Sequence, residues 1–386
     1  MGSLVILFGC KERNTANDFL PEMDAEAIKV YIDPDEQATI NLQDIIDTVR
    51  YIALETSDAV SIGSINILRF DEDKIFVGDI DNTQSIYCFN DSGKFIFKIQ
   101  NQGKGPGEYV SMNDFDLDRD SKFVLVHDAP SKAVLKYDFS GNFISRHVNG
   151  YLFDSFRHIK ENTVIAYSKY IANPGIKNFP NSSIFTFNYK TGKVEKSLLT
   201  FDDDLSLFMK IQGLINYTSS SGAVAYIYDY YNNTIYSYEE ETFSKRWEFT
   251  FGRRDIPDDF WINANFQTHK EEIRKGSICG GLINFQIAGN WILGYYPYKS
   301  KSNTLLYNRA TNSVGTVSEL IANSQTGFPV IFLPPYYSDG ESIISVIEPV
   351  WLDKILRQTI PDMTIPEVLK TLDINSNPIL QIIKLK

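Results

Sequence analysis

A glycine-rich stretch in the first third of the chain has the composition of a phosphate-binding loop. It reads QGKGPGEY over residues 102–109, and loops of this kind wrap backbone N–H groups around a phosphate. Two features argue against that chemistry. Lys104 is followed by Gly105 where a nucleotide loop needs Ser or Thr, and Pro106 has no N–H to donate. Residues 109–118 then alternate like a β-strand, whereas a phosphate loop opens a helix.

We therefore interpret the stretch as a tight connection between two sheets. Position 108 is Glu, so a GxGxxG dinucleotide fingerprint fails as well. In such a connection the glycines supply positive φ, Pro106 fixes a turn, and the Glu108 carboxylate accepts backbone N–H groups. The residues of this junction motif are Gly103, Lys104, Gly105, Pro106, Gly107, Glu108 and Tyr109.

Carboxylates in and after the motif are the candidates for metal binding. Glu108, Asp114 and Asp116 are oxygen donors of the kind that calcium prefers, and they could meet where several sheets converge. The run DFDLD (114–118) also fits an ordinary strand with solvated alternate positions, and we favour that interpretation. We expect no cofactor, with a metal ion at the centre of the fold as the alternative.

The histidines and cysteines predict no catalytic site. No HxH, HExxH or GxSxG pattern is present, and an Asp that recurs at positions 79 and 128 is better explained as a turn cap. Cys88 and Cys279 lie in apolar surroundings and are expected to be buried thiols. The four histidines are His127, His147, His158 and His269.

Aromatic side chains are the candidates for ligand binding. Most aromatic residues of a β-sheet protein pack between sheets, but those in loops and insertions can stack on a sugar or a peptide. The candidates are Trp261, Tyr295, Tyr296, Tyr336 and Tyr337.

The elements that would position these residues form a repeat. Residues 73–99 align with 121–148 as strand, Asp, turn, aromatic strand, Ser-Gly and final strand, so that Gly93 and Gly141 lie 48 residues apart. Weaker copies follow at 181–198, 223–249 and 291–317. A period of about 40–50 residues is typical of four-stranded propeller blades.

The ends of the chain supply a sixth copy. The segments 49–55 and 376–386 would share one blade and close the ring, which predicts an all-β, six-bladed propeller of antiparallel blades over residues 27–386. Residues 28–32 form a possible further pairing segment. Helix-like spacing is confined to 258–275, 347–358 and 365–372, and the insertion at about 253–283 could be a lid or a packed adornment.

Charge and composition exclude some classes of function. The net charge of −12, with no run of basic residues longer than Arg253-Arg254, argues against nucleic-acid binding. At the N-terminus, a short apolar run (4–8) leads into Gly9-Cys10, as at the end of a bacterial lipoprotein signal, although no Lys or Arg precedes it. We interpret residues 1–26 as a signal remnant and polar tether, with an ordinary frayed terminus as the alternative.

Several of these segments together resemble the six-bladed β-propeller lipoproteins of bacterial envelopes, which are related in repeat style to NHL propellers. The matching segments are YIALET (51–56), FNDSGKFIFKI (89–99), QGKGPGEY, NDFDLD (113–118), YDFSGNFISR (137–146) and NPILQIIKLK (377–386). The resemblance implies a lipid anchor at Cys10 and a propeller without a well-established catalytic activity.

These observations lead to one expectation and two alternatives. We expect a monomeric lipoprotein of the bacterial cell envelope, anchored in the outer membrane and facing the periplasm or the surface, that binds an envelope protein, peptide or glycan without catalysis. The first alternative is a propeller hydrolase or lyase with a metal in the central channel. The second is a structural platform on which another envelope protein docks.

Overall fold

The computed structural model describes most of the chain from residue 26 to residue 386. Cys10 and the predicted signal and tether lie outside the described residues. The described ranges are 26–201, 218–221, 224–263, 265–317, 320–322, 329–331, 334–356 and 364–386.

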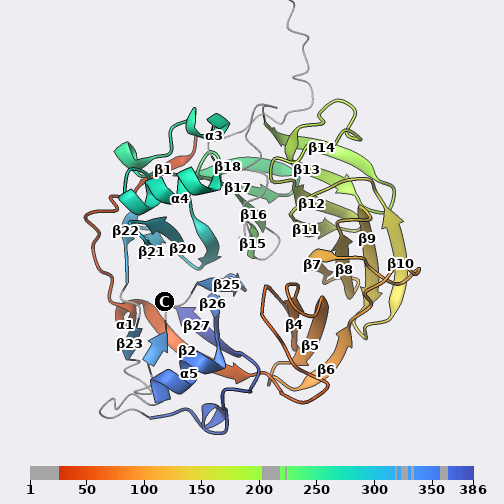
Figure 1. The fold of residues 1–386 in the computed structure, drawn as a ribbon, viewed down its shortest axis with the longest axis horizontal. Helices are drawn as coiled ribbons and strands as arrows, with labels where there is room; N and C mark the ends of the chain where they lie inside the picture. Colours follow the sequence, from red (N-terminus) through yellow and green to blue (C-terminus); the bar gives the residue numbers. More distant parts are fainter. Residues whose placement is uncertain are drawn as a thin grey trace, which may run out of the picture.

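Six four-stranded antiparallel sheets stand in a ring, so the predicted six-bladed β-propeller is confirmed (Figure 1). We number the blades in chain order and give the strands from the central axis outward. Blade 1 comprises β3 (Ile67–Asp71), β4 (Lys74–Asp79), β5 (Ser85–Asn90) and β6 (Phe95–Ile99). Blade 2 comprises β7 (Met112–Asp118), β8 (Phe123–Asp128), β9 (Ala133–Asp138) and β10 (Phe143–Val148). Blade 3 comprises β11 (Ser155–Lys160), β12 (Thr163–Tyr167), β13 (Ser182–Asn188) and β14 (Lys193–Thr200).

The second half of the ring is built in the same way. Blade 4 comprises β15 (Thr218–Ser221), β16 (Val224–Asp229), β17 (Thr234–Glu239) and β18 (Thr242–Thr250). Blade 5 comprises β19 (Ile283–Ala288), β20 (Trp291–Tyr298), β21 (Lys301–Asn308) and β22 (Ser313–Gly315). Blade 6 comprises β25 (Pro335–Ser338), β26 (Ser342–Ile347), β27 (Ile379–Leu385) and β2 (Ile46–Ala53). A separate two-stranded sheet consists of β23 (Leu320–Ala322) and β24 (Pro329–Ile331).

Both ends of the chain meet in blade 6, as the sequence predicts. Strand β2 pairs antiparallel with β27, with Tyr51 opposite Gln381. This pairing closes the ring by hydrogen bonds between segments more than 300 residues apart. The N-terminal segment also reaches blade 4, where β1 (Ile28–Tyr31) pairs in parallel with β18 as a fifth, outermost strand.

The repeated glycines occupy the outer hairpin turns of the first three blades. Gly93, Gly141 and Gly192 have φ values of 83°, 84° and 70°, in the left-handed region that glycine adopts without steric cost. In blade 4 the equivalent turn has no glycine, and Glu240 and Glu241 take positive φ instead. The sequence repeat therefore marks a backbone requirement of the hairpin.

Few helices interrupt the strands. The described helices are α1 (Leu42–Ile45), α3 (Phe260–Asn263), α4 (Phe266–Lys275) and α5 (Pro349–Leu356), with 3-10 turns η2 (Gly252–Arg254) and η3 (Glu367–Leu369). Helix α4 begins where the Asn265 side chain accepts the Thr268 N–H and ends at Gly276, whose φ is 75°. The predicted helix at 365–372 is wrong in extent, because only the single turn η3 forms there.

The helical insertion lies at the rim of blades 4 and 5 (Figure 1). Its backbone is tied to β20 through the Gly280 N–H, which donates to the Pro297 carbonyl at 2.9 Å. Of the two expectations, the insertion is a packed adornment, and it does not cover the centre of the ring in this view. No helix among the described residues is long and apolar enough to cross a membrane.

Candidate ligand-binding site

The central channel carries a buried network of charged side chains. Arg69 on β3 donates from Nε to Asp116 Oδ1 at 2.9 Å and from Nη2 to Asp114 Oδ1 at 3.2 Å. Arg157 on β11 places Nη1 3.5 Å from Asp114 Oδ2. All four side chains are at most 6% exposed. Blade 2 therefore contributes two carboxylates, and the neighbouring blades contribute the two cations that neutralise them.

The remaining carboxylate oxygens accept backbone N–H groups from blade 3. The Phe156 N–H donates to Asp114 Oδ2 at 2.9 Å, and the His158 N–H donates to Asp116 Oδ2 at 2.7 Å. Arg157 reaches on to blade 4, donating from Nη2 to the Thr218 carbonyl at 3.2 Å. Each charged group thus joins two blades, so the network ties the ring together from blade 1 to blade 4.

Burial and the arginines act on the carboxylates in opposite directions. Burial raises the pKa of Asp114 to about 6, against the positive charges of Arg69 and Arg157. Burial also acts to raise the pKa of Asp116, but the nearby arginines outweigh it and hold this pKa below its usual value. Burial, followed by the charge of Arg69, lowers the pKa of Arg157 to about 10.

The predicted metal candidates are therefore occupied by other partners. Asp114 and Asp116 are held by arginines, and the Glu108 carboxylate accepts the Gly105 N–H at 2.7 Å within the junction motif. Within the part of the chain that the structure describes, no group of three or more His, Cys, Asp and Glu side chains is arranged to hold a metal ion. The carboxylates of the channel serve blade-to-blade contact.

The junction motif connects β6 of blade 1 to β7 of blade 2. Gly103 donates its N–H to the Tyr109 carbonyl at 2.9 Å, and Arg146 Nη1 donates to the Glu108 carbonyl at 2.6 Å. The expectation of positive φ at its glycines is wrong, because none of the three has one. Gly107 is needed for close approach instead, because a Cβ there would lie 2.9 Å from the Phe143 ring, whereas a Cβ on Gly103 would meet only the movable end of the Glu108 side chain.

Four of the five predicted aromatic ligand residues are buried in the core. Trp261 packs against Tyr230 and Tyr231, and Tyr337 stacks on Phe70 with ring centroids 5.0 Å apart. Tyr295 and Tyr296 on β20 are also buried, and only Tyr336 remains partly exposed. Their rings contribute to packing between blades, so the ligand-binding candidates of the sequence do not form one exposed site.

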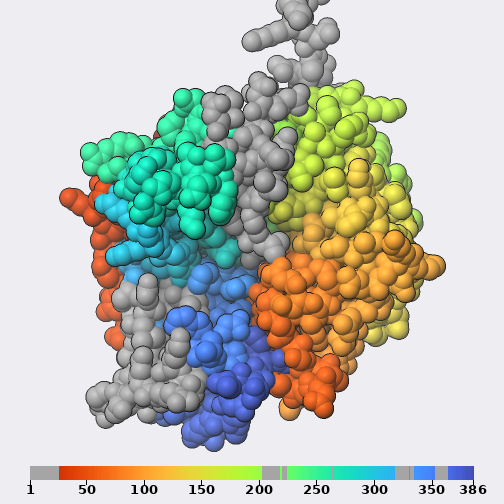
Figure 2. All heavy atoms as spheres, viewed as in Figure 1, coloured from red at the N-terminus to blue at the C-terminus, as the bar shows by residue number. Residues whose placement is uncertain are grey.

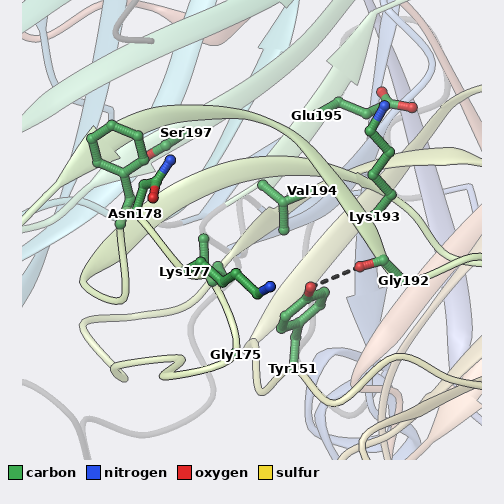
Figure 3. Close-up of a pocket in the computed structure, with 11 residues that line it drawn as sticks. Tyr151, Gly175, Lys177, Asn178, Gly192, Lys193, Val194, Glu195 and Ser197 are labelled. Atoms are coloured by element: carbon green, nitrogen blue, oxygen red, sulfur yellow. Dashed lines mark hydrogen bonds between the residues drawn. The ribbon is translucent and has the colours of Figure 1, made fainter. Parts of the chain in front are cut away.

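A pocket of about 340 Å³ lies instead on blade 3 (Figure 3). Its walls come from three segments: Tyr151 before β11, residues 175–179 in the β12–β13 connection, and residues 192–197 of the following hairpin and β14. Lys177, Lys193 and the Glu195 carboxylate are among its polar groups. This pocket was not predicted from the sequence. The one signal was the β12–β13 connection, 14 residues long where the equivalent connection of blade 1 has five.

Hydrogen bonds within the protein hold the walls of the pocket in place. Asn173 is 2% exposed; its Oδ1 accepts the Leu152 N–H at 2.7 Å and its Nδ2 donates to the Leu152 carbonyl at 2.9 Å. The Tyr151 hydroxyl donates to the Gly192 carbonyl at 2.7 Å, as the dashed line in Figure 3 shows. Because both contacts are internal to the protein, the pocket exists before any ligand arrives.

Comparisons with known proteins place the fold in a family without an assigned activity. The sequence model described as "Domain of unknown function (DUF4934)" matches residues 26–384. No curated protein sequence matches the chain. A putative exported protein from Bacteroides fragilis NCTC 9343 superposes with a TM-score of 0.73 at 17% identity, over 94% of this chain and 100% of that one. A DUF4221 member from Bacteroides vulgatus superposes with a TM-score of 0.52 at 10% identity, over 88% and 97%.

Proposed function

Residues 26–384 place this chain in the DUF4934 family, and on that premise we propose that it is a cell-envelope lipoprotein whose propeller binds a ligand and catalyses no reaction. The observation that carries the proposal is the preformed pocket on blade 3, with polar and aromatic groups in its walls. The channel supports the same view, because its carboxylates are already paired with arginines. A catalytic metal in the channel would have to displace these pairs.

The cellular location belongs to the same proposal. Cys10 is the lipidation site, and the anchored propeller acts as a monomer at the outer membrane with an envelope glycan, peptide or protein as its partner. The similarity of fold to a protein described as exported, and the resemblance of the blade hairpins to NHL-type envelope propellers, support this location. Fatty-acid labelling of cells that express the chain tests it: Cys10→Ala should abolish the label, and equal labelling of the variant would contradict the anchor.

A screen for ligands with a blocked pocket tests the binding role. The full chain is screened by thermal shift against glycans and peptides, and each hit is measured again with Val194→Trp, which fills the pocket. The matched control is Ile144→Trp, at a half-exposed position on the outer strand of blade 2. We expect hits that Val194→Trp abolishes and the control retains. Ligands that still bind the Val194→Trp variant would show that the binding site lies elsewhere on the protein.

The same preparation tests the absence of catalysis. Elemental analysis after dialysis should find no tightly held divalent ion at one per chain. A stoichiometric ion that survives a chelator would overturn the non-catalytic assignment and favour the metal-dependent hydrolase or lyase.

A further inference from the structure

Basic side chains gather around the blade 3 pocket in a protein whose net charge is −12. Lys177 and Lys193 line the pocket, and Lys190 lies in the β13–β14 turn beside it. Blade 2 contributes Lys136 from β9 and His147 from β10, whose ring centroid is 6.0 Å from that of Tyr189 in the same turn. Residues 189–193 therefore join the pocket to the basic groups of blade 2. In Figure 2 the segment that carries the pocket lies at the upper right edge of the face, in lime green.

Among the described residues, the lysines around the pocket form no ion pair, a property they share with Lys98, Lys132 and Lys301. No carboxylate oxygen in the described part of the chain lies within 4.0 Å of the ammonium groups of Lys136, Lys177, Lys190 or Lys193. Elsewhere lysines pair closely with carboxylates, as in Lys74–Asp73, Lys122–Asp71, Lys245–Glu248 and Lys275–Glu272.

The unpaired charges act on one another. Burial, and after it the positive charges of Lys190 and Lys136, lowers the pKa of His147. Lys136 is half-buried, with its ammonium 3.6 Å from the centroid of the Phe123 ring. Repulsion between these positive groups destabilises the folded protein. A bound anion would offset this repulsion.

The walls of the pocket restrict what kind of anion fits. Glu195 lies two residues after Lys193 on β14 and therefore on the same face of this strand. This carboxylate would repel a dense polyanion such as a polyphosphate, but it accepts hydrogen bonds from hydroxyl groups. Phe179 adds a half-buried ring and Asn178 an amide, and rings of this kind pack against the apolar face of a sugar.

We propose that the blade 3 pocket binds a sugar that carries a carboxylate, with Lys177 and Lys193 holding the carboxylate and Glu195 and Asn178 holding hydroxyl groups. Lys190, Lys136 and His147 extend the site to further acidic units of an oligosaccharide. The inference rests on the proposed binding function, and it names the chemical class of ligand for the same pocket.

Calorimetric titration of the full chain with a panel of uronate trisaccharides, and with neutral trisaccharides of the same linkage, tests the proposal. We expect uronates to bind and neutral trimers to bind at least tenfold more weakly. Lys177→Gln or Lys193→Gln should weaken uronate binding by about tenfold, and raising the salt concentration should weaken it further. Lys301→Gln, at an exposed lysine of blade 5, is the matched control and should change nothing. An unchanged melting temperature shows that each variant folds.

The alternative outcomes separate this proposal from the one on which it rests. Neutral trimers that bind as tightly as uronates, with no effect of the lysine variants, would overturn the anionic ligand and leave the binding function standing. Inorganic phosphate that competes as strongly as the uronates would show a general anion site and overturn the sugar. No binding of any uronate at millimolar concentration overturns the inference, and the blocked-pocket screen above decides the binding function independently.

Discussion

The central channel and the rim of blade 3 both concentrate charge, but they differ in how that charge is balanced. In the channel, Arg69 and Arg157 neutralise Asp114 and Asp116 within 3.5 Å, and the Oδ2 atoms of both carboxylates also accept backbone N–H groups. On the rim, Lys177 and Lys193 are exposed, and among the described residues neither ammonium group has a carboxylate oxygen within 4.0 Å. Charge that is satisfied internally stabilises the ring, whereas unpaired charge is available to a ligand.

Removal of Arg69 is the strongest test of the channel's role. The Arg69→Ala variant leaves Asp114 and Asp116 buried without their nearest cation, and we expect the free energy of unfolding to fall by about 3–5 kcal/mol. Urea denaturation at neutral pH measures it. The matched control is Arg274→Ala, whose guanidinium pairs with Glu271 on the exposed side of α4 and should have no measurable effect.

A second substitution distinguishes lost pairing from lost packing. Adding Asp116→Asn to Arg69→Ala removes one uncompensated charge and should restore part of the stability. A double variant as unstable as the single one would mean that Arg69 acts through its bulk, and the contrast with the rim would lose its electrostatic basis.

His127 should make the blade 2–blade 3 contact sensitive to acid. Its ring stacks on Phe153 with centroids 3.5 Å apart, and burial lowers its pKa to about 3. The unfolded chain therefore binds this proton from about pH 6.5 downward, whereas the folded chain does not until about pH 3. Stability should fall on acidification through this window by about 1.4 kcal/mol per pH unit from this group alone.

His127→Phe keeps the stacked ring and removes the titration. The difference in free energy of unfolding between variant and wild type should grow in favour of the variant from pH 6.5 to pH 4, as measured by urea midpoints. A difference that stays constant over this range would show that His127 is protonated in the folded protein.

The junction motif between blades 1 and 2 offers a steric test of close packing. A Cβ at Gly107 would lie 2.9 Å from the Phe143 ring, so Gly107→Ala forces blade 2 to shift and should cost about 1–3 kcal/mol. Gly175→Ala in the pocket wall is the control, because its Cβ would meet the Tyr151 ring at an ordinary 3.4 Å. Equal urea midpoints for the two variants would contradict the close approach as the reason for glycine at 107.

The sequence predicted the features that repeat and missed those that depend on contacts between blades. The turns at Gly93 and Gly141 recur because each hairpin needs the same positive φ, and this local requirement is visible as a period. Arg69 and Asp116 lie 47 residues apart in sequence, so a short-range sequence pattern cannot predict that they pair.

The pocket escaped prediction for a similar reason. Its walls combine Tyr151, the β12–β13 connection and β14, and only the folded blade brings them together. The aromatic candidates such as Trp261 were misjudged because sequence position cannot distinguish a ring that an insertion exposes from one that packs back against the blades. Burial depends on the packing of blades 4 and 5 around that residue.

On the rim, loss of a single charge should leave stability unchanged and shift only the pKa of a neighbouring histidine. Lys190→Gln removes one of the positive charges that lower the pKa of His147, so this pKa should rise toward its usual value, as followed by NMR titration of the imidazole. Lys301→Gln should leave it unchanged. If His147 titrates identically in all three proteins, burial alone sets its pKa, and the basic groups around the pocket act separately instead of as one anion-binding surface.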